Sequence, residues 1–221
     1  MGKEELCYRT KEKILEPGHT ALIMVDMQRD FCCRDGKFAQ AGRDISDVVE
    51  IIPNCRKLLH SARKSGVFIV HLQQVTLRGQ KSDNAGWLAF KTRDGKSAEY
   101  ALLGSLGAET IEELKPEGEE VVIQKFRPSG FHGTFLDQIL RANRIETVLI
   151  CGTTTEGCVM ATVLDASFHD YYTCVVQDAV ASSVKKMQET AIEFMKTRYK
   201  IYSTEEVVSC WNRTVTVHSP A

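Results

Sequence analysis

Three residues that could perform chemistry follow short apolar runs in this sequence. The run at 21–25 ends in Asp26, the run at 120–124 ends in Lys125, and the run at 147–152 leads through "TTTEG" to Cys158. A thiol nucleophile needs a base, and the base needs a charge that orients it, so these three side chains form a possible catalytic set. If each run is a strand of one parallel sheet, the side chains gather beyond the carboxyl ends of the strands, where open α/β sheets bind ligands.

The segment "GTTTEGCV" at 152–159 places Cys158 at the predicted start of a helix. Unpaired N–H groups and the helix dipole at such a start stabilise a thiolate. A free thiol titrates at pH ~8.5, so attack at neutral pH still needs a base, and Asp26 is the candidate. Lys125 would keep Asp26 ionised, and the N–H groups of the glycine-threonine loop could bind the oxyanion of a carbonyl under attack.

Each of the three residues also has an ordinary structural interpretation. An Asp after a strand often forms a turn, a Lys that closes a strand is usually a solvated charge, and a Cys early in a helix is commonly a small buried hydrophobe. Their joint placement at three strand ends favours the chemical interpretation. It also argues against a non-catalytic binding protein, in which one member of the set would be expected to be lost.

The hydrophobic pattern predicts the elements that position these residues. Short continuous apolar runs alternate with longer segments of helical period, as in parallel strands that are buried on both faces and joined by helices. We therefore expect an α/β fold, a three-layer α/β/α arrangement with a central, mostly parallel six-stranded sheet, as one domain over 1–221. The expected strands are 21–26, 67–72, 120–125, 147–152, 172–177 and 200–203.

Three segments have the period of amphipathic helices. Residues 47–64 form the first, which Gly66 ends and in which Pro53 either makes a kink or lies in the first turn. Thr134 caps the second, which runs through Ala142. The third lies within 182–199; it is predicted to begin at a cap, Ser182 or Ser183, and to turn Met187, Ala191, Phe194 and Met195 inward.

Between the second and third strands, residues 76–106 make a long excursion rich in Gly, Lys, Asp and Ser, with aromatic residues at Trp87 and Phe90. An excursion of this length in a compact domain usually carries function or is mobile. The first strand is followed by the acidic, bulky segment "DMQRDFCCRDG" at 26–36. A nucleotide-binding module would have a glycine-rich phosphate loop there, so phosphate binding is disfavoured.

Composition indicates a soluble globular protein with a small-molecule partner. Of 221 residues 43% are hydrophobic and 26% charged, and the net charge is −1, which gives no electrostatic basis for binding nucleic acid. The start "MGKEELCYRT" lacks the apolar core of a signal peptide, so we expect a cytosolic protein without a membrane anchor. We therefore expect the eight cysteines to be thiols, with Cys151 in the core and a redox role for the adjacent Cys32 and Cys33 disfavoured.

Three separated blocks resemble the isochorismatase-like cysteine hydrolases: "ALIMVDMQRDFC" at 21–32, "VVIQKFRPSGFHGTFLDQILR" at 121–141 and "VLICGTTTEGCVMATVLDASFHDYYTCVVQDA" at 148–179. The resemblance implies a catalytic triad of Asp26, Lys125 and Cys158. It further implies an oxyanion hole made by the N–H groups of Thr154 and Cys158, and a cis peptide bond between Thr153 and Thr154. Members of this family are usually dimers or tetramers, so a homo-oligomer is expected.

Within the family, the loop motif looks closest to the N-carbamoylsarcosine amidase-like amidohydrolases. That resemblance implies hydrolysis of a small terminal amide or N-carbamoyl (ureido) substrate to ammonia and an acid, through a thioester and without a cofactor. Isochorismatase-type ether hydrolysis and nicotinamidase- or ureidoacrylate-type hydrolysis are the alternatives. Nicotinamidases hold a metal after the second strand, whereas "VHLQQVTLRGQ" at 70–80 offers only His71. A metal is thus not expected, and His71 is interpreted as a packed or hydrogen-bonded residue.

Four residues near the strand ends are candidates for substrate contacts: Phe31, Trp87, Arg127 and Phe131. Arg127 could hold a substrate carboxylate with two hydrogen bonds or form a surface salt bridge. Phe31 and Phe131 are either pocket or core aromatics, and Trp87 could close the pocket of its own or a neighbouring subunit. Glu156, beside the nucleophile, is expected to be exposed to solvent.

Overall fold

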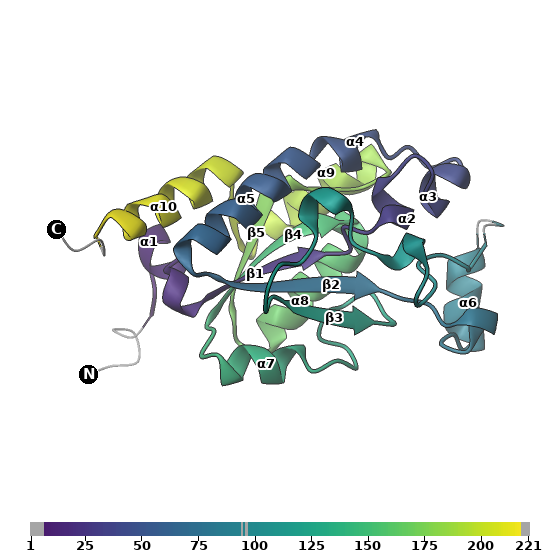
Figure 1. Ribbon diagram of the computed structural model, residues 1–221, viewed down its shortest axis with the longest axis horizontal. Coiled ribbons are helices and arrows are strands. Elements are labelled where there is room, and N and C mark those ends of the chain that lie inside the picture. Colours follow the sequence, from purple (N-terminus) through teal and green to yellow (C-terminus); the bar gives the residue numbers. More distant parts are fainter. Residues whose placement is uncertain (1–6, 94, 96, 218–221) are drawn as a thin grey trace.

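A single six-stranded parallel sheet organises the protein (Figure 1). The structure, a computed structural model, describes residues 7–93, 95 and 97–217. The strand order is β3-β2-β1-β4-β5-β6, and every pairing is parallel, which confirms the predicted fold class. The strands are β1 (Thr20–Val25), β2 (Phe68–Gln74), β3 (Val121–Lys125), β4 (Thr147–Thr153), β5 (Tyr172–Ala181) and β6 (Lys200–Tyr202).

The strand order creates the crevice in which the candidate residues meet. From β1 the chain moves outward through β2 to β3, and then returns to the other side of β1 with β4. At such a reversal the connections on the two sides lie on opposite faces of the sheet, which leaves a crevice beyond the carboxyl ends of the strands. Asp26 follows β1 directly, and Cys158 lies five residues beyond the end of β4.

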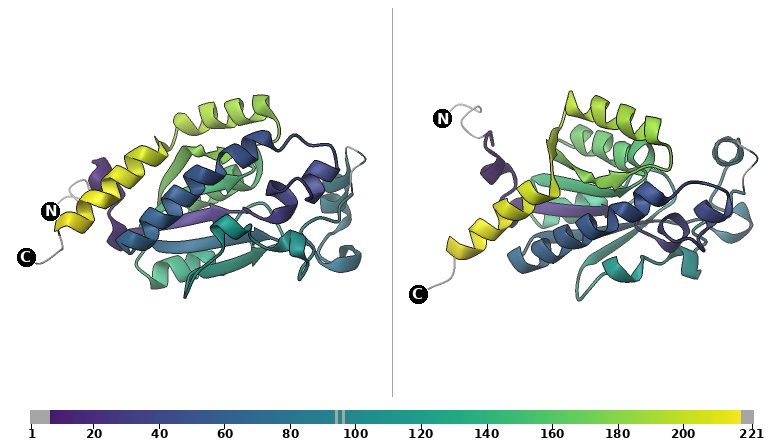
Figure 2. Two further views of the ribbon diagram at one scale, coloured as in Figure 1. Left: turned by 45° about the horizontal axis from the view of Figure 1, so that its top comes forward. Right: turned by 90° about the horizontal axis from the view of Figure 1, so that it is seen from above.

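Helices cover both faces of the sheet (Figure 2). Leu22 and Met24 of β1 pack into a core with α5 and α10, whereas the alternate residues Ile23 and Val25 pack into a second core with α7, α8 and α9. Period-two alternation along a strand that is buried on both faces explains why the apolar runs are continuous in sequence. The covering helices are α5 (Ile52–Ser65), α10 (Thr204–Val217), α7 (Leu136–Ala142), α8 (Met160–Phe168) and α9 (Lys185–Lys196).

The predicted helix at 47–64 is two helices, α4 (Ser46–Glu50) and α5. Pro53 lies in the first turn of α5, where its missing N–H costs nothing, so it starts a helix rather than kinking one. Gly66 ends α5 with a φ of 69°, as predicted for a left-handed C-terminal cap.

The other two predicted helices begin later than expected. The hydroxyl of Thr134 accepts the N–H of Leu136, so it supports the start of α7 from two residues upstream. Strand β5 runs on to Ala181, so the turn falls at 182–184 and Val184, not Ser182 or Ser183, precedes α9. Ala191 and Met195 are buried as predicted, but Met187 is 43% exposed because it lies in the outward-facing first turn.

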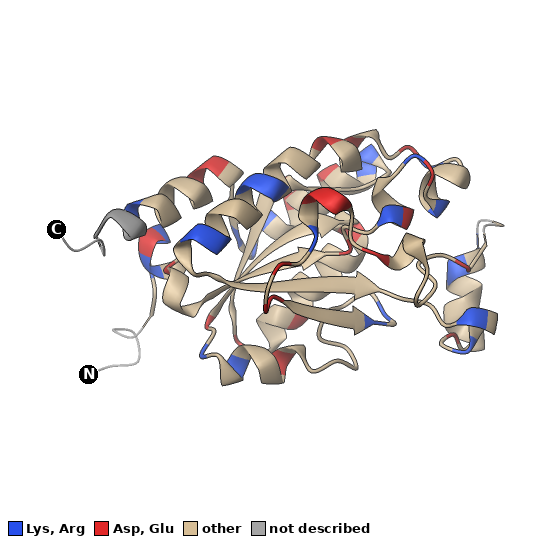
Figure 3. Ribbon diagram, in the orientation of Figure 1, with Lys and Arg blue, Asp and Glu red and all other residues tan. Residues whose placement is uncertain are grey.

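The excursion after β2 carries a helix of its own, α6 (Ala85–Thr92), whose start is capped by the Asn84 side chain accepting the N–H of Trp87 at 2.8 Å. Both basic and acidic residues are spread over the face shown in Figure 3. Within the described residues, no helix combines the length and hydropathy that crossing a bilayer requires. The remaining short α-helices are α1 (Lys11–Ile14), α2 (Arg29–Cys32) and α3 (Lys37–Gln40). The label η marks other short helices: the 3-10 helices η2 (Pro17–His19), η3 (Arg78–Gln80), η4 (Leu106–Ala108) and η5 (Glu112–Leu114), and the π-helix η6 (Thr155–Val159).

Candidate active site

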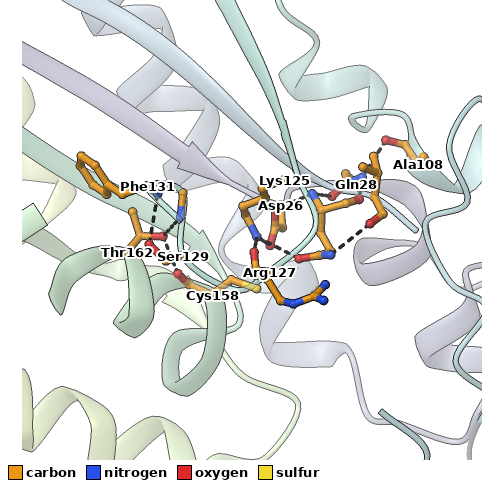
Figure 4. Close-up of polar contacts among 12 residues, drawn as sticks. Asp26, Gln28, Ala108, Lys125, Arg127, Ser129, Phe131, Cys158 and Thr162 are labelled. Carbon is orange, nitrogen blue, oxygen red and sulfur yellow. Dashed lines mark hydrogen bonds and ion pairs between the residues drawn. The ribbon is translucent and has the colours of Figure 1, made fainter. Parts of the chain in front are cut away.

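Asp26 lies just beyond β1 in a left-handed conformation, with a φ of 50°, and is 2% exposed. Its Oδ1 accepts the backbone N–H of Gln74 at 2.9 Å, and its Oδ2 accepts from the ammonium group of Lys125 at 2.8 Å (Figure 4). The ends of three neighbouring strands therefore meet at this carboxylate. Asp26 itself follows β1, Gln74 at the end of β2 donates its backbone N–H, and Lys125 at the end of β3 donates from its ammonium group. A role in the turn alone does not explain Asp26, because both of its carboxylate oxygens accept hydrogen bonds from residues at the ends of other strands.

Lys125 is completely buried, which rules out a solvated surface charge. Burial alone would lower the pKa of Lys125, but the negative charge of Asp26 and the contact with Cys158 outweigh it, so the pKa is raised. The ammonium group also approaches Gln74 Oε1 at 3.3 Å and the carbonyl oxygen of Arg127 at 3.4 Å. A buried cation with this set of acceptors is held in one place and stays charged.

Cys158 lies on η6, a turn of π-helix that leads into α8. The carbonyl oxygen of Thr154 accepts the N–H groups of Gly157 and Val159, both at 3.1 Å, and fixes the turn. A Cβ atom at Gly157 would lie 2.7 Å from the Thr154 hydroxyl, so a larger residue there would require the Thr154 side chain to shift. The peptide bond between Thr153 and Thr154 is cis. Turns of this kind within α-helices occur frequently at functional sites.

The helix start does not give Cys158 a resting thiolate, contrary to the expectation from sequence. The pKa of Cys158 is raised to about 12, first by burial and then by the charge of Asp26, and the nearby ammonium of Lys125 offsets this only in part. The thiol is therefore protonated at neutral pH. Asp26 lines the same cavity beside the thiol and raises its pKa, so its carboxylate can accept the proton at the moment of attack.

Two glutamines that the sequence pattern did not single out hold this arrangement together. Gln28 Nε2 donates to the carbonyl oxygens of Gln74 at 2.9 Å and Ala108 at 2.7 Å, and its Oε1 accepts the N–H of Gln74. Both glutamines are buried. Gln74 is the last residue of β2, as Lys125 is the last residue of β3. Inspecting the residue that ends each strand therefore identifies Gln74 too, but the predicted second strand stopped at 72.

A cavity of about 340 Å³ opens beside Cys158 and Asp26. Of the four residues predicted to contact substrate, Phe31 and Trp87 line it. Phe31 meets Phe38 edge-on at 4.7 Å and Tyr100 at 5.8 Å, so an aromatic wall that includes two residues missed from sequence forms one side. Their signal is weak in sequence because they come from segments far apart in the chain.

Arg127 and Phe131 are not among the residues that line this cavity. The guanidinium of Arg127 lies over the ring of Trp87 at 5.1 Å and donates to the carbonyl oxygen of Ser82 at 3.2 Å, so it supports a wall from behind. Phe131 stacks on His169 at 5.0 Å and belongs to the second core. Neither residue is thus placed to contact substrate: Pro128 lines the cavity, while the Phe131 side chain turns into the core, which is the second of the two interpretations that its sequence position left open.

Glu156 is only partly exposed and lines the cavity, which corrects the expectation of a solvated side chain. Its Oε2 is buried and has no hydrogen-bond partner among the described residues. The turn of η6 brings it to the same side as Cys158, two residues later in the chain. A carboxylate oxygen in this position can accept a hydrogen bond from a ligand that carries N–H groups.

His71 is buried in β2, and its Nε2 contacts Glu120 Oε2 at 2.8 Å, which confirms the packed and hydrogen-bonded interpretation. Burial lowers the pKa of His71 more than the contact with Glu120 raises it. Within the part of the chain that the structure describes, no group of three or more His, Cys, Asp or Glu side chains is arranged to hold a metal ion. The cysteine assigned to the core, Cys151, is fully buried.

A profile described as the isochorismatase domain matches residues 20–207, which is most of the chain. The chain therefore belongs to the isochorismatase domain family, as the three sequence blocks indicate. The matched region includes the carboxylate, the ammonium and the thiol of the site. The family assignment thus rests on the segments that build the crevice.

Individual relatives of this family are similar over comparable lengths. A ureidoacrylate amidohydrolase RutB from Yersinia enterocolitica is 33% identical over 172 residues, which are 72% of this chain and 74% of that protein. A cysteine hydrolase from Pseudomonas syringae pv. phaseolicola superposes with a TM-score of 0.80 at 26% identity, covering 90% of this chain and 95% of that one. An N-carbamoylsarcosine amidase from Thermoplasma acidophilum superposes with a TM-score of 0.68 at 27% identity, covering 84% and 96%.

Proposed function

We propose that the protein is a cysteine-dependent amidohydrolase that cleaves a small terminal amide or N-carbamoyl (ureido) substrate to ammonia and an acid. The observation that carries the proposal is the convergence of Asp26, its ion-pair partner Lys125 and the Cys158 thiol at one end of the cavity. The relatives named above include two enzymes whose names state amide or ureido hydrolysis, which supports the same reaction class.

In the first half-reaction Asp26 accepts the thiol proton of Cys158 as the sulfur attacks the carbonyl carbon. Burial makes a free thiolate unfavourable, so proton transfer and attack occur together. The Lys125 ammonium stays charged and compensates the negative charge that moves between carboxylate and sulfur. The N–H groups of Thr154 and Cys158, both residues of the cavity wall, are the proposed donors to the oxyanion.

The first half-reaction ends when the protonated Asp26 gives its proton to the departing nitrogen. The C–N bond breaks, ammonia leaves, and an acyl group stays on sulfur as a thioester, or a carbamoyl group as the corresponding thiocarbamate. In the second half-reaction water, deprotonated by the same carboxylate, attacks the carbonyl carbon of this intermediate. The C–S bond breaks, the acid leaves and the thiol is regenerated, so one water is consumed for each ammonia released.

The buried Oε2 of Glu156 supports an amide or ureido substrate over a vinyl ether. A carboxylate oxygen withdrawn from water without a hydrogen bond is costly, and a substrate with N–H donors would provide one. A vinyl ether oxygen is only an acceptor and would leave the carboxylate unsatisfied. Glu156 is therefore proposed to orient the carbamoyl or amide nitrogen beside Cys158.

The test is ammonia release from a panel of N-carbamoylsarcosine, other N-carbamoyl amino acids, ureidoacrylate, biuret and nicotinamide. We expect release from at least one substrate, and a fall of at least about 1,000-fold in Cys158→Ser because the serine hydroxyl is a far weaker acid than the thiol. Circular dichroism and thermal unfolding verify that the variant is folded. A serine variant with full activity would refute the nucleophile.

The panel also separates the other reactions of the family. Release from nicotinamide alone would favour a nicotinamidase. An absence of ammonia from every substrate, together with cleavage of isochorismate, would favour the ether hydrolase. A cytosolic location and a homo-oligomer of this enzyme are part of the proposal; the eight free thiols support the location, and the family resemblance supports the oligomer.

A further inference from the structure

The cavity is lined by acidic and basic side chains, most of which already have a partner. Lys91 Nζ lies 2.9 Å from Asp83 Oδ2, with both side chains almost fully buried, and Asp26 is paired with Lys125. Arg43 differs from these groups. Among the residues that the structure describes, no carboxylate lies within ion-pair distance of its guanidinium, which lies over the ring of Phe38.

The Arg43 guanidinium is nevertheless held in place. Its central carbon lies 4.3 Å from the centroid of the Phe38 ring, and Phe38 is fixed by edge contacts with Phe31 at 4.7 Å and Tyr100 at 5.8 Å. Stacking on a ring uses the flat face of the guanidinium and leaves the N–H donors at its rim for a planar, two-oxygen acceptor. The contact holds the side chain at the cavity wall, where its N–H donors are available to a carboxylate.

Arg43 lines two adjoining hollows. One is the cavity that contains Cys158, and the other, of about 450 Å³, shares Phe38, Arg43, Lys91 and Tyr100 with it but does not reach Cys158. Arg43 therefore lies where the two open into each other. The cavity gives a ligand with its reacting group at Cys158 room to extend toward this junction.

We infer that Arg43 binds the carboxylate of the substrate and selects anionic ureido or amido acids over neutral amides. The inference rests on the proposed function, because it places the carbamoyl group at Cys158 and the acid group at Arg43. It replaces Arg127, the residue that sequence suggested for a carboxylate, since Arg127 donates to backbone carbonyl oxygens and lies behind Trp87.

The experiment compares N-carbamoyl-β-alanine with its neutral methyl ester, with ammonia release as the readout. In Arg43→Gln we expect KM for the acid to rise about 10- to 100-fold with a smaller change in kcat, because a charge-assisted, two-pronged hydrogen bond is lost. The ester should change less than about threefold. Arg43→Lys keeps the charge without the planar fork and should show an intermediate loss that is confined to the acid.

Two further measurements sharpen the comparison. Added salt should raise KM for the acid and leave the ester unchanged in the wild type, and this salt effect should disappear in Arg43→Gln. The matched control is Arg34→Gln, an exposed arginine outside both hollows, which should behave as wild type with both substrates. Equal losses for acid and ester in Arg43→Gln, or no loss for either, would overturn the inference.

Failure of the inference is distinguishable from failure of the proposed function. If the wild type hydrolyses only neutral amides such as nicotinamide, the amidohydrolase stands and the role of Arg43 is overturned. If no substrate releases ammonia, calorimetric binding of N-carbamoyl-β-alanine decides: binding to the wild type that is lost in Arg43→Gln supports the anion site. Equal binding to both proteins, or binding to neither, overturns it.

Discussion

At the scale of single residues, the site is an electrostatic arrangement in which each group fixes the state of the next. Lys125 remains an ammonium because Asp26 faces it, and the charge of Asp26 in turn helps to keep the Cys158 thiol protonated. The resting enzyme therefore has its negative charge on oxygen, and sulfur acquires it only when a carbonyl is present. This differs from cysteine sites in which a helix start or a cationic neighbour yields a standing thiolate.

Replacing Asp26 by Asn should separate turnover from thiol reactivity. Turnover should fall at least about 100-fold because the general base is lost. Alkylation of Cys158 by iodoacetamide at mildly alkaline pH should become faster, since removal of the carboxylate charge lowers the pKa of the thiol and leaves Lys125 to pair with a thiolate.

The control for this prediction is Cys158→Ala, made both in the wild type and in Asp26→Asn. Mass spectrometry of these variants shows how much alkylation occurs at the other cysteines. In the wild type, the alkylation rate of Cys158 should keep rising with pH up to the limit of protein stability, because the pKa of about 12 lies above it. Slower alkylation of Asp26→Asn, or a wild-type rate that levels off near the pKa of a free thiol, would contradict this arrangement.

At the scale of elements, the site depends on how closely two strands approach before they diverge. Gly152 of β4 has a φ of 115°, and a Cβ atom there would collide with the backbone of Val25 on β1. Val25 directly precedes Asp26, and Gly152 directly precedes Thr153, so this contact sets the distance between the base and the nucleophile loop. Only glycine provides both the backbone angle and the space.

Gly152→Ala should therefore lower the free energy of unfolding by at least about 2 kcal/mol and reduce turnover in the fraction that folds. Urea unfolding, monitored by tryptophan fluorescence, measures the first effect. Gly18→Ala is the matched control, since Gly18 has an ordinary φ and open space around it. A Gly152 variant as stable as the Gly18 variant would show that the strands can separate without cost.

At the scale of the whole molecule, polar contacts tie the helical layer to the sheet far from the site. Arg63 of α5 donates to both oxygens of Glu120, at 2.7 and 3.0 Å, and His71 of β2 contacts the same carboxylate. Burial alone would raise the pKa of Glu120, but hydrogen bonds from Arg63, the N–H of Glu117 and His71 lower it to about 2. The carboxylate is therefore ionised through almost the whole accessible pH range.

This pKa has a consequence for stability as a function of pH. A carboxyl group whose pKa is lower in the folded than in the unfolded protein stabilises the fold above the unfolded pKa of about 4.3, and the effect is lost as pH falls through the folded value. Glu120→Gln should cost about 1–3 kcal/mol of unfolding free energy at pH 7, and the difference from wild type should shrink between pH ~4.5 and pH ~2. Denaturant titrations at several pH values measure it.

The neighbouring Glu119→Gln provides the control, because Glu119 is exposed on the same turn. Its unfolding free energy should stay within about 0.5 kcal/mol of wild type at every pH. If the Glu120→Gln difference stayed constant down to the folded pKa, the stabilisation would come from packing of the side chain and not from its charge.

The amino-acid sequence alone suffices to predict the parallel sheet and the three groups at its strand ends. Apolar runs buried on both faces are a local property, and the residue that ends each run is read directly from the chain. Asp26, Lys125 and Cys158 are therefore identifiable from sequence, and the six strands lie within a few residues of their predicted positions, except that β5 continues to Ala181. Helix starts are less predictable because the lengths of the preceding strands and turns decide them.

The protonation state of Cys158 and the lining of the cavity depend instead on the folded chain. The pKa of the thiol depends on its distance from groups more than 30 residues away in sequence and on the water excluded around it, so a local helix start predicts the wrong direction. Which aromatic and charged residues face the cavity is likewise set by side-chain direction after the chain has folded. Phe131 and Arg127 follow Lys125 in sequence but turn away, whereas Arg43 comes from a distant segment and faces the cavity.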